Sequence, residues 1–207
     1  MKTPESQPSV TRPVAAERAY RSPAGIAGGV LLLVMGAWLG FDALVNGDAR
    51  TAWLAVAGLL FVVPLVVAFT IRPAVYANED RLRVRNPFRV ITLPWASVAD
   101  LRASYSSEVF TEGGDKYQLW AIPVSMRARK KANRAAGGRK GGGLKGDADS
   151  VPRRAAGDQS LDEIRELARD HADKPSAQGE PSIRWAYEII APVVVGAVLM
   201  AVLVVIG

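Results

Sequence analysis

Three long runs of apolar residues constrain the fold of this chain more than any other feature of its sequence. They cover residues 24–45, 52–71 and 187–206 of a 207-residue chain. A helix needs roughly 20 apolar residues to cross the hydrocarbon core of a bilayer. A helix that is apolar all round can also be buried in a globular core, but a chain of this size cannot build a core that hides three of them. The runs therefore predict three transmembrane helices.

The first run also invites an interpretation as a cleavable signal peptide, because Arg12, Arg18 and Arg21 precede it. The leader is long, however, no convincing small-x-small cleavage site follows it, and a second apolar run begins almost at once. We therefore interpret the first run as a retained signal-anchor. Its glycine pairs, spaced four residues apart, predict a face that packs closely against the second run. These pairs are Gly25 with Gly29 and Gly36 with Gly40.

The basic residues that flank the three runs predict their orientation. Lys2, Arg12, Arg18 and Arg21 precede the first run, and Arg72, Arg81, Arg83, Arg85 and Arg89 follow the second. The short loop between these runs carries one basic residue, Arg50. Because Lys and Arg are enriched on the cytoplasmic side, the N-terminal tail (residues 1–23) and the middle segment are predicted to be cytoplasmic. We expect a multi-pass protein of the plasma membrane whose interfacial aromatic residues include Trp53, Trp185 and Tyr187.

The middle segment begins with a pattern typical of short strands. Charged and apolar residues alternate from Arg81 to Arg85, the dipeptide Asn86-Pro87 predicts a turn, and residues 88–93 predict the next strand. Residues 109–111 and 116–122 flank a second turn, at residues 112–115. Residues 73–124 are therefore predicted to form an antiparallel sheet with one buried face. Its expected core residues are Leu82, Val84, Leu93, Trp95 and Val98.

The second half of the middle segment predicts a loop, a helix and a linker. Residues 125–159 are rich in Gly and basic residues and nearly lack large apolar ones, so we predict a flexible basic loop. Its candidate contacts with anionic lipid are Arg127, Arg129, Lys130, Lys131, Arg134, Arg139, Lys140 and Lys145. Ser160 and Glu163 have the spacing of a capping box, which predicts an amphipathic helix over residues 160–172. Residues 173–186 are predicted to be a linker to the third run.

The strand segment resembles a known family. Arg81-Leu82-Arg83-Val84-Arg85-Asn86-Pro87-Phe88 and Leu93-Pro94-Trp95-Ala96-Ser97-Val98 resemble the actinobacterial PH-domain membrane proteins, the low-molecular-weight antigen 6 family. Two apolar runs before the domain fit the usual layout of that family, whereas the Gly-rich basic insertion and the third run depart from its simplest members. The resemblance implies a PH-like half-barrel of antiparallel strands capped by a helix, with no enzymatic activity.

The sequence offers little support for catalysis or for a cofactor. Cysteine is absent and His171 is the one histidine, which leaves too few ligands for a typical zinc site. The glycine-rich residues 137–145 lack the Gly-Lys-Ser/Thr ending of a phosphate-binding loop. We therefore expect no catalytic residue, no metal and no cofactor.

One basic pattern, Arg81-x-Arg83, is similar to part of the motif with which some PH domains bind phosphoinositide headgroups. The preceding turn, Asn78-Glu79-Asp80, is acidic where a basic residue would be needed. The favoured interpretation is that Arg81, Arg83 and Arg85 form the solvated face of a half-buried strand.

Two hypotheses of function follow. The leading one is a membrane-anchored module that binds a protein partner at the cytoplasmic face. The second is anionic-lipid sensing by the basic loop, to which each Lys or Arg near the surface contributes about 1 kcal/mol. Nucleic acid is a less favoured partner because residues 126–159 contain no aromatic residue. A transporter is also disfavoured, because the runs lack an internal ionisable residue. The sequence leaves the oligomeric state open.

Overall fold

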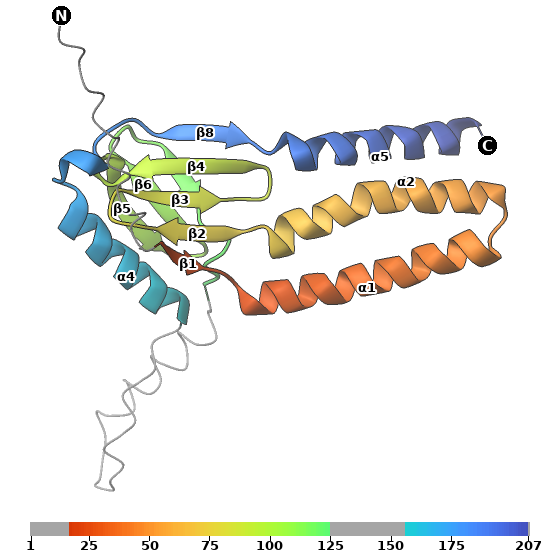
Figure 1. Cartoon of the computed structure of the whole chain (residues 1–207), viewed down its shortest axis with the longest axis horizontal. Helices are drawn as coiled ribbons and strands as arrows, with labels where there is room; N and C mark the ends of the chain where they lie inside the picture. Colours follow the sequence, from red (N-terminus) through yellow and green to blue (C-terminus); the bar gives the residue numbers. More distant parts are fainter. Residues whose placement is uncertain (1–16, 125–155, 207) are drawn as a thin grey trace, which may run out of the picture.

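The computed structural model describes residues 17–124 and 156–206, which form a β domain at one end of three long helices (Figure 1). The helices are α1 (Pro23–Asn46), α2 (Ala49–Val66) and α5 (Tyr187–Ile206), and a π-helical turn, η1 (Val67–Ile71), continues α2. All three are long and apolar enough to cross a membrane. The second helix begins three residues before the predicted run because the Asp48 side chain caps it, accepting a hydrogen bond of 2.8 Å from the Thr51 amide.

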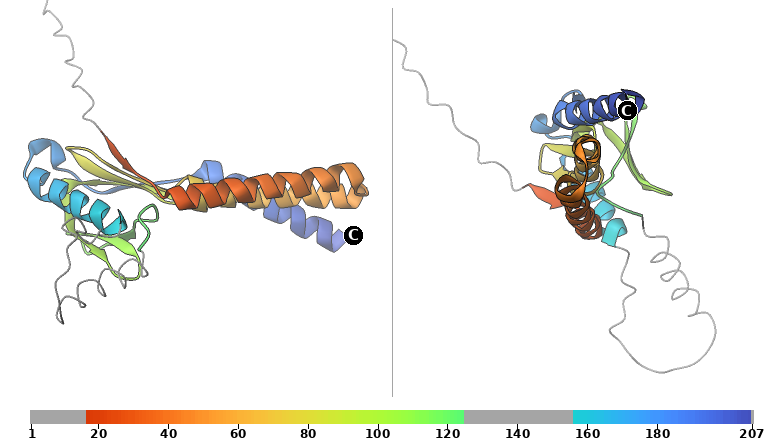
Figure 2. Two further views of the ribbon diagram at one scale, coloured as in Figure 1. Left: turned by 90° about the horizontal axis from the view of Figure 1, so that it is seen from below. Right: turned by 90° about the vertical axis from the view of Figure 1, so that its right-hand side faces the viewer.

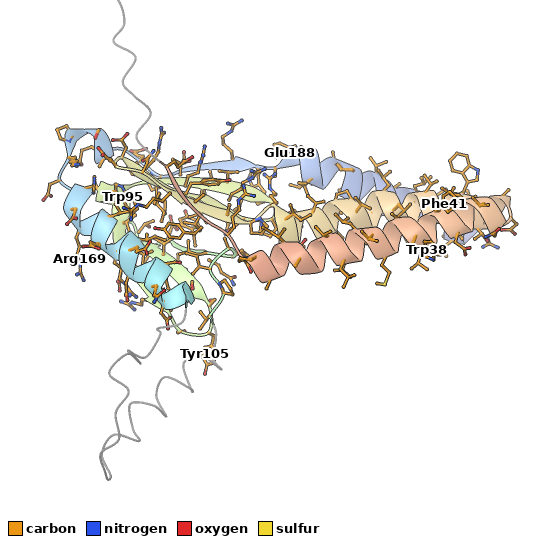
Figure 3. The ribbon with its side chains drawn as sticks, turned by 60° about the horizontal axis from the view of Figure 1, so that its bottom comes forward. Trp38, Phe41, Trp95, Tyr105, Arg169 and Glu188 are labelled. Atoms are coloured by element: carbon orange, nitrogen blue, oxygen red, sulfur yellow. The ribbon has the colours of Figure 1, made fainter. Side chains whose placement is uncertain are left out.

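The helix α2 lies between α1 and α5 and contacts both (Figure 2). Gly196 of α5 lies against the backbone of α2, since a Cβ atom there would be 2.5 Å from the Phe61 nitrogen. The predicted glycine face of α1 is only partly used. Gly29 meets Thr70 and Gly40 meets Leu59, whereas a Cβ atom at Gly36 would have nothing within 4 Å. Most other side chains of the helices point outward, as Trp38 and Phe41 do in Figure 3.

The described strands pair antiparallel, as the alternating pattern predicts, but they form two sheets where the sequence predicted one. The larger sheet has the strand order β1-β2-β3-β4-β8 and the smaller has the order β5-β6-β7. Their bounds are β1 (Arg18–Tyr20), β2 (Ala74–Ala77), β3 (Arg81–Arg85), β4 (Arg89–Pro94), β5 (Val98–Ala103), β6 (Ser107–Thr111), β7 (Lys116–Gln118) and β8 (Ser182–Trp185). The 3₁₀ turn η2 (Trp95–Ser97) connects the two sheets between β4 and β5.

The core lies between the two sheets and the helix α4 (Ala156–His171). Leu82, Val84, Leu93 and Trp95 are fully buried there, and Val98 is partly buried against the same cluster. The Trp95 indole donates a hydrogen bond of 2.8 Å to the Asn78 carbonyl, so its one polar atom is satisfied. The apolar stripe of α4 closes the core with two further buried residues, Leu161 and Ile164.

Two predicted connecting segments turned out to contain strands. Strand β1 lies within the predicted tail of residues 1–23, and strand β8 lies within the predicted linker of residues 173–186, which also holds the 3₁₀ turn η4 (Pro175–Ala177). These two strands are the edges of the larger sheet, where they pair with β2 and β4. Their own sequences carry a weak strand signal because the strands are only 3 and 4 residues long and most of their residues are exposed. Pairing with a neighbouring strand, rather than local propensity, places them in the sheet.

The start of the predicted amphipathic helix was also wrong. Helix α4 begins at Ala156, so Ser160 lies inside the helix instead of capping it, and residues 156–159 belong to the helix instead of the basic loop. The first turn of the helix packs closely against the segment that follows β7. A Cβ atom at Gly157 would be 2.6 Å from the Pro123 carbonyl oxygen, so only glycine allows the first turn to lie there. At the other end, His171 Nδ1 lies 2.9 Å from the Leu167 carbonyl oxygen.

Three strands of the larger sheet continue almost directly into the three long helices (Figure 1). Strand β1 leads into α1, η1 leads into β2, and β8 leads into α5, each across one or two residues. The N-terminal strand and the β domain therefore lie at the same end of the helices. The loop between α1 and α2 and the end of α5 lie at the other end.

We expect the close contact between α5 and α2 to make Gly196 sensitive to substitution. The variant Gly196→Ala should unfold at a lower temperature than the parent chain in detergent, because the methyl group would overlap the backbone at Phe61. The matched control is Gly36→Ala, where the methyl group meets open space. Alanine should be neutral or slightly stabilising there. Equal melting temperatures for the two variants would contradict this packing.

Candidate anion-binding face

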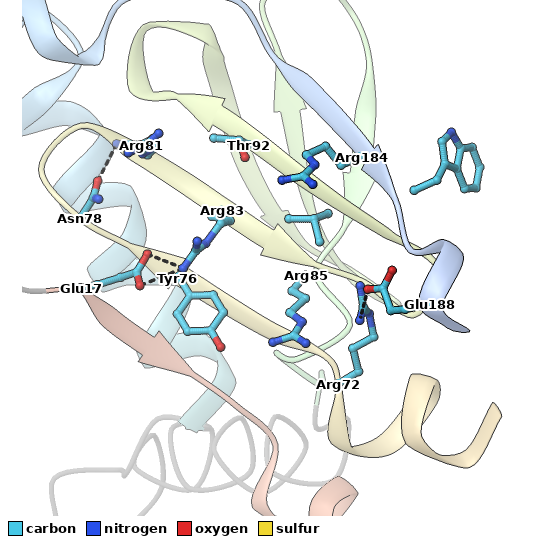
Figure 4. Close-up of a pocket in the computed structure, with 12 residues that line it drawn as sticks. Glu17, Arg72, Tyr76, Asn78, Arg81, Arg83, Arg85, Thr92, Arg184 and Glu188 are labelled. Atoms are coloured by element: carbon cyan, nitrogen blue, oxygen red, sulfur yellow. Dashed lines mark hydrogen bonds and ion pairs between the residues drawn. The ribbon is translucent and has the colours of Figure 1, made fainter. Parts of the chain in front are cut away.

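The outward face of the larger sheet is rich in arginine because its strands alternate strictly. Leu82 and Val84 of β3 point into the core, so Arg81, Arg83 and Arg85 point away from it. The cross-strand neighbours of Arg83 are Tyr76 on β2 and Thr92 on β4. Arg85 is opposite Val90, which in turn is opposite Arg184 on β8. Side chains from four segments of the chain thus gather on one surface (Figure 4).

This surface forms a shallow groove of about 580 Å³, which we call the arginine groove. It is lined by Glu17, Arg72, Tyr76, Asn78, Arg81, Arg83, Arg85, Val90, Thr92, Arg184, Trp185 and Glu188. Five arginines face two glutamates, so positive charge dominates the groove.

Arg72 has a structural role at one end of the groove. Its Nη1 atom lies 2.9 Å from Glu188 Oε1, and its Nε atom donates to the Asn86 carbonyl at 3.4 Å. The Arg72 side chain is only 5% exposed, whereas that of Glu188 is 63% exposed. Because Arg72 follows η1 and Glu188 begins α5, the ion pair ties the end of the second helix to the start of the third. The guanidinium of Arg72 is therefore largely occupied by the protein itself.

Arg83, in the middle of the groove, is partly neutralised by the N-terminal segment. Its Nη2 atom lies 3.0 and 2.9 Å from the two carboxylate oxygens of Glu17. The same guanidinium lies 4.8 Å from the centre of the Tyr76 ring, within cation–π distance. The Tyr76 hydroxyl accepts a hydrogen bond of 2.8 Å from Arg21. Burial raises the pKa of Tyr76, but the hydrogen bonds and charges of Arg21 and Arg85 outweigh it, so that this pKa is lowered overall.

Three arginines of the groove form no ion pair with a described residue, although Arg85 also interacts with the Tyr76 hydroxyl and with the charge of Glu188. Within the described ranges, no carboxylate lies at ion-pair distance from Arg81, Arg85 or Arg184. A guanidinium presents planar, paired N–H donors that match the oxygens of a phosphate or a carboxylate. With a rise of about 3.3 Å per residue and about 4.8 Å between strands, the Cα atoms of Arg85 and Arg184 lie about 10 Å apart. That separation lets two guanidinium groups converge on one anion.

The two ends of the groove lie at different distances from the long helices. Arg85 and Arg184 lie at the end nearest the helices, close to the Arg72–Glu188 pair (Figure 4). Arg81 and the turn at residues 78–80 lie at the opposite end, about 13 Å farther along β3 at the usual strand rise. The phosphoinositide interpretation considered from the sequence depended on this distant turn. Among the arginines of the groove without an ion-pair partner in the described residues, Arg85 and Arg184 lie nearest the helices. Sequence reasoning did not bring these two residues together.

The other site residues expected from the sequence fall into two groups. The expected core residues are structural, as described above. The eight candidate lipid contacts of the basic loop, from Arg127 to Lys145, lie outside the described residues. Sequence reasoning missed Glu17 and Arg184, which lie in segments predicted to be a tail and a linker. The alternation in Ser182-Ile183-Arg184-Trp185 was the one available signal for Arg184. In the described part of the chain, no group of three or more His, Asp or Glu residues is arranged to hold a metal ion.

A comparison with known families indicates what kind of domain the middle of the chain forms. Residues 72–169 match the family model of a bacterial PH domain. The match begins at Arg72 and extends to Arg169 in α4, so it includes strands β2 to β7 but neither β1 nor β8. No curated protein and no solved structure matches the chain. The middle of the chain is thus similar to bacterial PH domains, and two antiparallel sheets closed by a helix are compatible with a PH-like half-barrel.

The Arg72–Glu188 pair yields a prediction about stability. The variant Arg72→Gln should lose about 1–3 kcal/mol of unfolding free energy, because a buried charge-assisted contact and a hydrogen bond to Asn86 disappear together. The control Arg81→Gln removes the same charge from an exposed position and should change stability by less than about 0.5 kcal/mol. Chemical unfolding of the detergent-solubilised chain measures both. A loss in the control as large as that in Arg72→Gln would argue against the clamp.

Proposed function

We propose that this chain is a non-enzymatic integral membrane protein whose PH-like domain binds the phosphate groups of anionic lipid headgroups in the arginine groove. The observation that carries the proposal is the position of Arg85 and Arg184. Both lack a carboxylate partner among the described residues, and both lie where the sheet meets helices long enough to span a bilayer.

Depth in the membrane favours this end of the groove. A bilayer is about 30 Å thick in its hydrocarbon core and about 40–45 Å with its interfacial regions, which leaves about 5–8 Å of interface on each side. Arg184 precedes α5 by three positions, and Arg85 pairs with Ala74 at the start of β2. Both side chains are thus within reach of lipid phosphates when the helices span the bilayer. Arg81 is too far from the helix ends to meet the phosphate of an ordinary phospholipid.

The energy of this contact comes from more than long-range attraction. Each basic residue near an anionic leaflet contributes about 1 kcal/mol, and this part weakens with salt. A paired hydrogen bond from a guanidinium to a phosphate adds a directional contribution that is less sensitive to screening. The groove therefore supports recognition of a headgroup rather than a general attraction to negative surfaces.

The finer expectations from the sequence belong to the same proposal. We place the domain on the cytoplasmic side of a plasma membrane, because Lys and Arg favour that side. The actinobacterial, antigen 6-like affiliation also stays a prediction. A protein partner was the leading hypothesis from the sequence, and it stays a prediction. Among the described residues, no surface favours it. The lipid alternative gains support from the folded face of the sheet rather than from the basic loop.

The proposal predicts a loss of anionic lipid in the double variant Arg85→Gln/Arg184→Gln. Retention of phosphatidylglycerol by the full-length chain, measured by native mass spectrometry, should fall about tenfold, since two charge-assisted contacts are removed. The charge-matched control is Arg102→Gln/Arg169→Gln, which changes two exposed arginines outside the groove. Retention in this control should match the parent chain. An equal loss in both double variants would mean that net charge, not the groove, holds the lipid.

Glu17 should act in the opposite direction. Its carboxylate contacts Arg83, so it competes with an incoming anion for that guanidinium. The variant Glu17→Gln is expected to raise phosphatidylglycerol retention several-fold, whereas Glu112→Gln, at an exposed turn of the smaller sheet, should leave it unchanged. A fall in retention on Glu17→Gln would contradict competition and would instead make Glu17 a residue that holds Arg83 in position.

A further inference from the structure

A second cluster of side chains lies on the other side of the sheet, near the ends of the long helices. Phe69 belongs to η1, Phe88 to the turn between β3 and β4, and Trp120 to the segment after β7. The ring centres of Phe69 and Phe88 are 5.4 Å apart, and those of Phe69 and Trp120 are 5.3 Å apart, both in edge-to-face arrangements. Such pairs hold the rings in fixed orientations.

These rings border a pocket of about 380 Å³, which we call the aromatic pocket. It is lined by Phe69, Asn86, Pro87, Phe88, Arg89, Gln118, Trp120 and Trp185. Its volume lies within the range of about 300–1,000 Å³ that small-molecule sites occupy. The pocket and the arginine groove share Trp185 in their linings but open on opposite faces of the sheet. Arg89 alternates along β4 with Val90, which lines the groove, so the two side chains point to opposite faces of the sheet.

Three aromatic side chains that line the pocket are exposed to solvent. Phe69 is 40% exposed, Trp120 is 43% exposed and Trp185 is 55% exposed, whereas Trp95 in the core is fully buried. Phe69 lies three positions before Arg72, and Trp185 lies two positions before the start of α5. The exposed rings are thus level with the ends of the long helices. At that level a bilayer offers its interface, where Trp is favoured because one part of its ring system is apolar and its N–H is polar.

Two polar groups in the pocket lack partners of their own. Arg89 has no carboxylate at ion-pair distance in the described ranges, and its guanidinium lies over the Tyr117 ring at 5.4 Å. Asn86 is 4% exposed, and its Nδ2 atom donates to the Gln118 carbonyl at 2.9 Å. The Asn86 Oδ1 atom has no hydrogen-bond partner. This atom is buried, so of these two residues Arg89 is the one that offers hydrogen-bond donors to a ligand.

We propose that the aromatic pocket binds the headgroup of a zwitterionic phospholipid, which carries a phosphate and an ammonium group. The lipid phosphate contacts the Arg89 guanidinium. The ammonium group lies among the aromatic rings, which attract cations. The start of the acyl chains lies against Phe69 and Trp120. The assignment rests on the proposed membrane insertion but not on the arginine groove, because the two sites take different headgroups.

The experiment uses the full-length chain in nanodiscs that contain phosphatidylethanolamine, phosphatidylcholine and phosphatidylglycerol, followed by native mass spectrometry of the retained lipids. The parent chain should retain all three lipids, the two zwitterionic ones in the aromatic pocket and phosphatidylglycerol in the arginine groove. The variant Arg89→Gln should lose about tenfold in phosphatidylethanolamine retention and keep phosphatidylglycerol. The groove variant Arg85→Gln/Arg184→Gln should show the reverse pattern. Unchanged ethanolamine retention in Arg89→Gln would overturn the assignment, and so would an equal loss of all three lipids in that variant.

A second readout tests the position of the pocket without requiring selective retention. The triple variant Trp38→Phe/Trp53→Phe/Trp185→Phe keeps only Trp95 and Trp120. Phosphatidylethanolamine brominated near the start of its acyl chains should quench the emission of Trp120. The buried Trp95 should not respond, as a further variant with Trp120→Phe would establish. If the triple variant shows no more quenching than the variant that also lacks Trp120, the pocket does not contact lipid and the proposal fails.

Discussion

The rest of the structure depends on the direct continuation of three strands into three helices. Strands β1, β2 and β8 belong to one hydrogen-bonded sheet, and each joins a long helix across one or two residues. The register of the sheet therefore sets the relative positions of the helix ends. The ion pair between Arg72 and Glu188 reinforces this where the end of the second helix meets the start of the third. A domain attached at three points cannot turn freely, unlike a domain on a flexible linker.

This attachment places both candidate sites at a fixed distance from the ends of the long helices. The outward face of the sheet carries the arginine groove, and the opposite side opens at the same end into the aromatic pocket. A strand rises about 3.3 Å per residue, so a shift of two residues along β3 or β4 moves a side chain through most of the interfacial region. Arg85 and Arg89 flank the short turn at residues 86–88, and the strand alternation sends them to different faces. One hairpin thereby contributes a cation to each site.

The sequence predicted those parts of the fold whose signal is local. The apolar runs predicted three long helices, and the alternation from Arg81 to Arg85 predicted a strand with Leu82 and Val84 facing inward. The edge strands β1 and β8 escaped prediction because they are three and four residues long and largely exposed, so that pairing with β2 and β4 places them in the sheet. The arginine groove was missed for the same reason. Its members Glu17, Arg83 and Arg184 are distant in sequence, and only the strand order brings them together.

The arginines of the groove differ in what they leave available to a ligand, although their sequence context looks uniform. Arg72 is buried and already bonded to Glu188 and to the Asn86 carbonyl, so a ligand would have to displace protein contacts to reach it. Arg83 is exposed, but Glu17 and the ring of Tyr76 share its guanidinium. A new anion gains most where desolvation is modest and no carboxylate has to be released. In this groove that condition is met at Arg81, Arg85 and Arg184, and the last two lie nearest the helices. This local difference is a stronger argument for a lipid phosphate than the total count of basic residues.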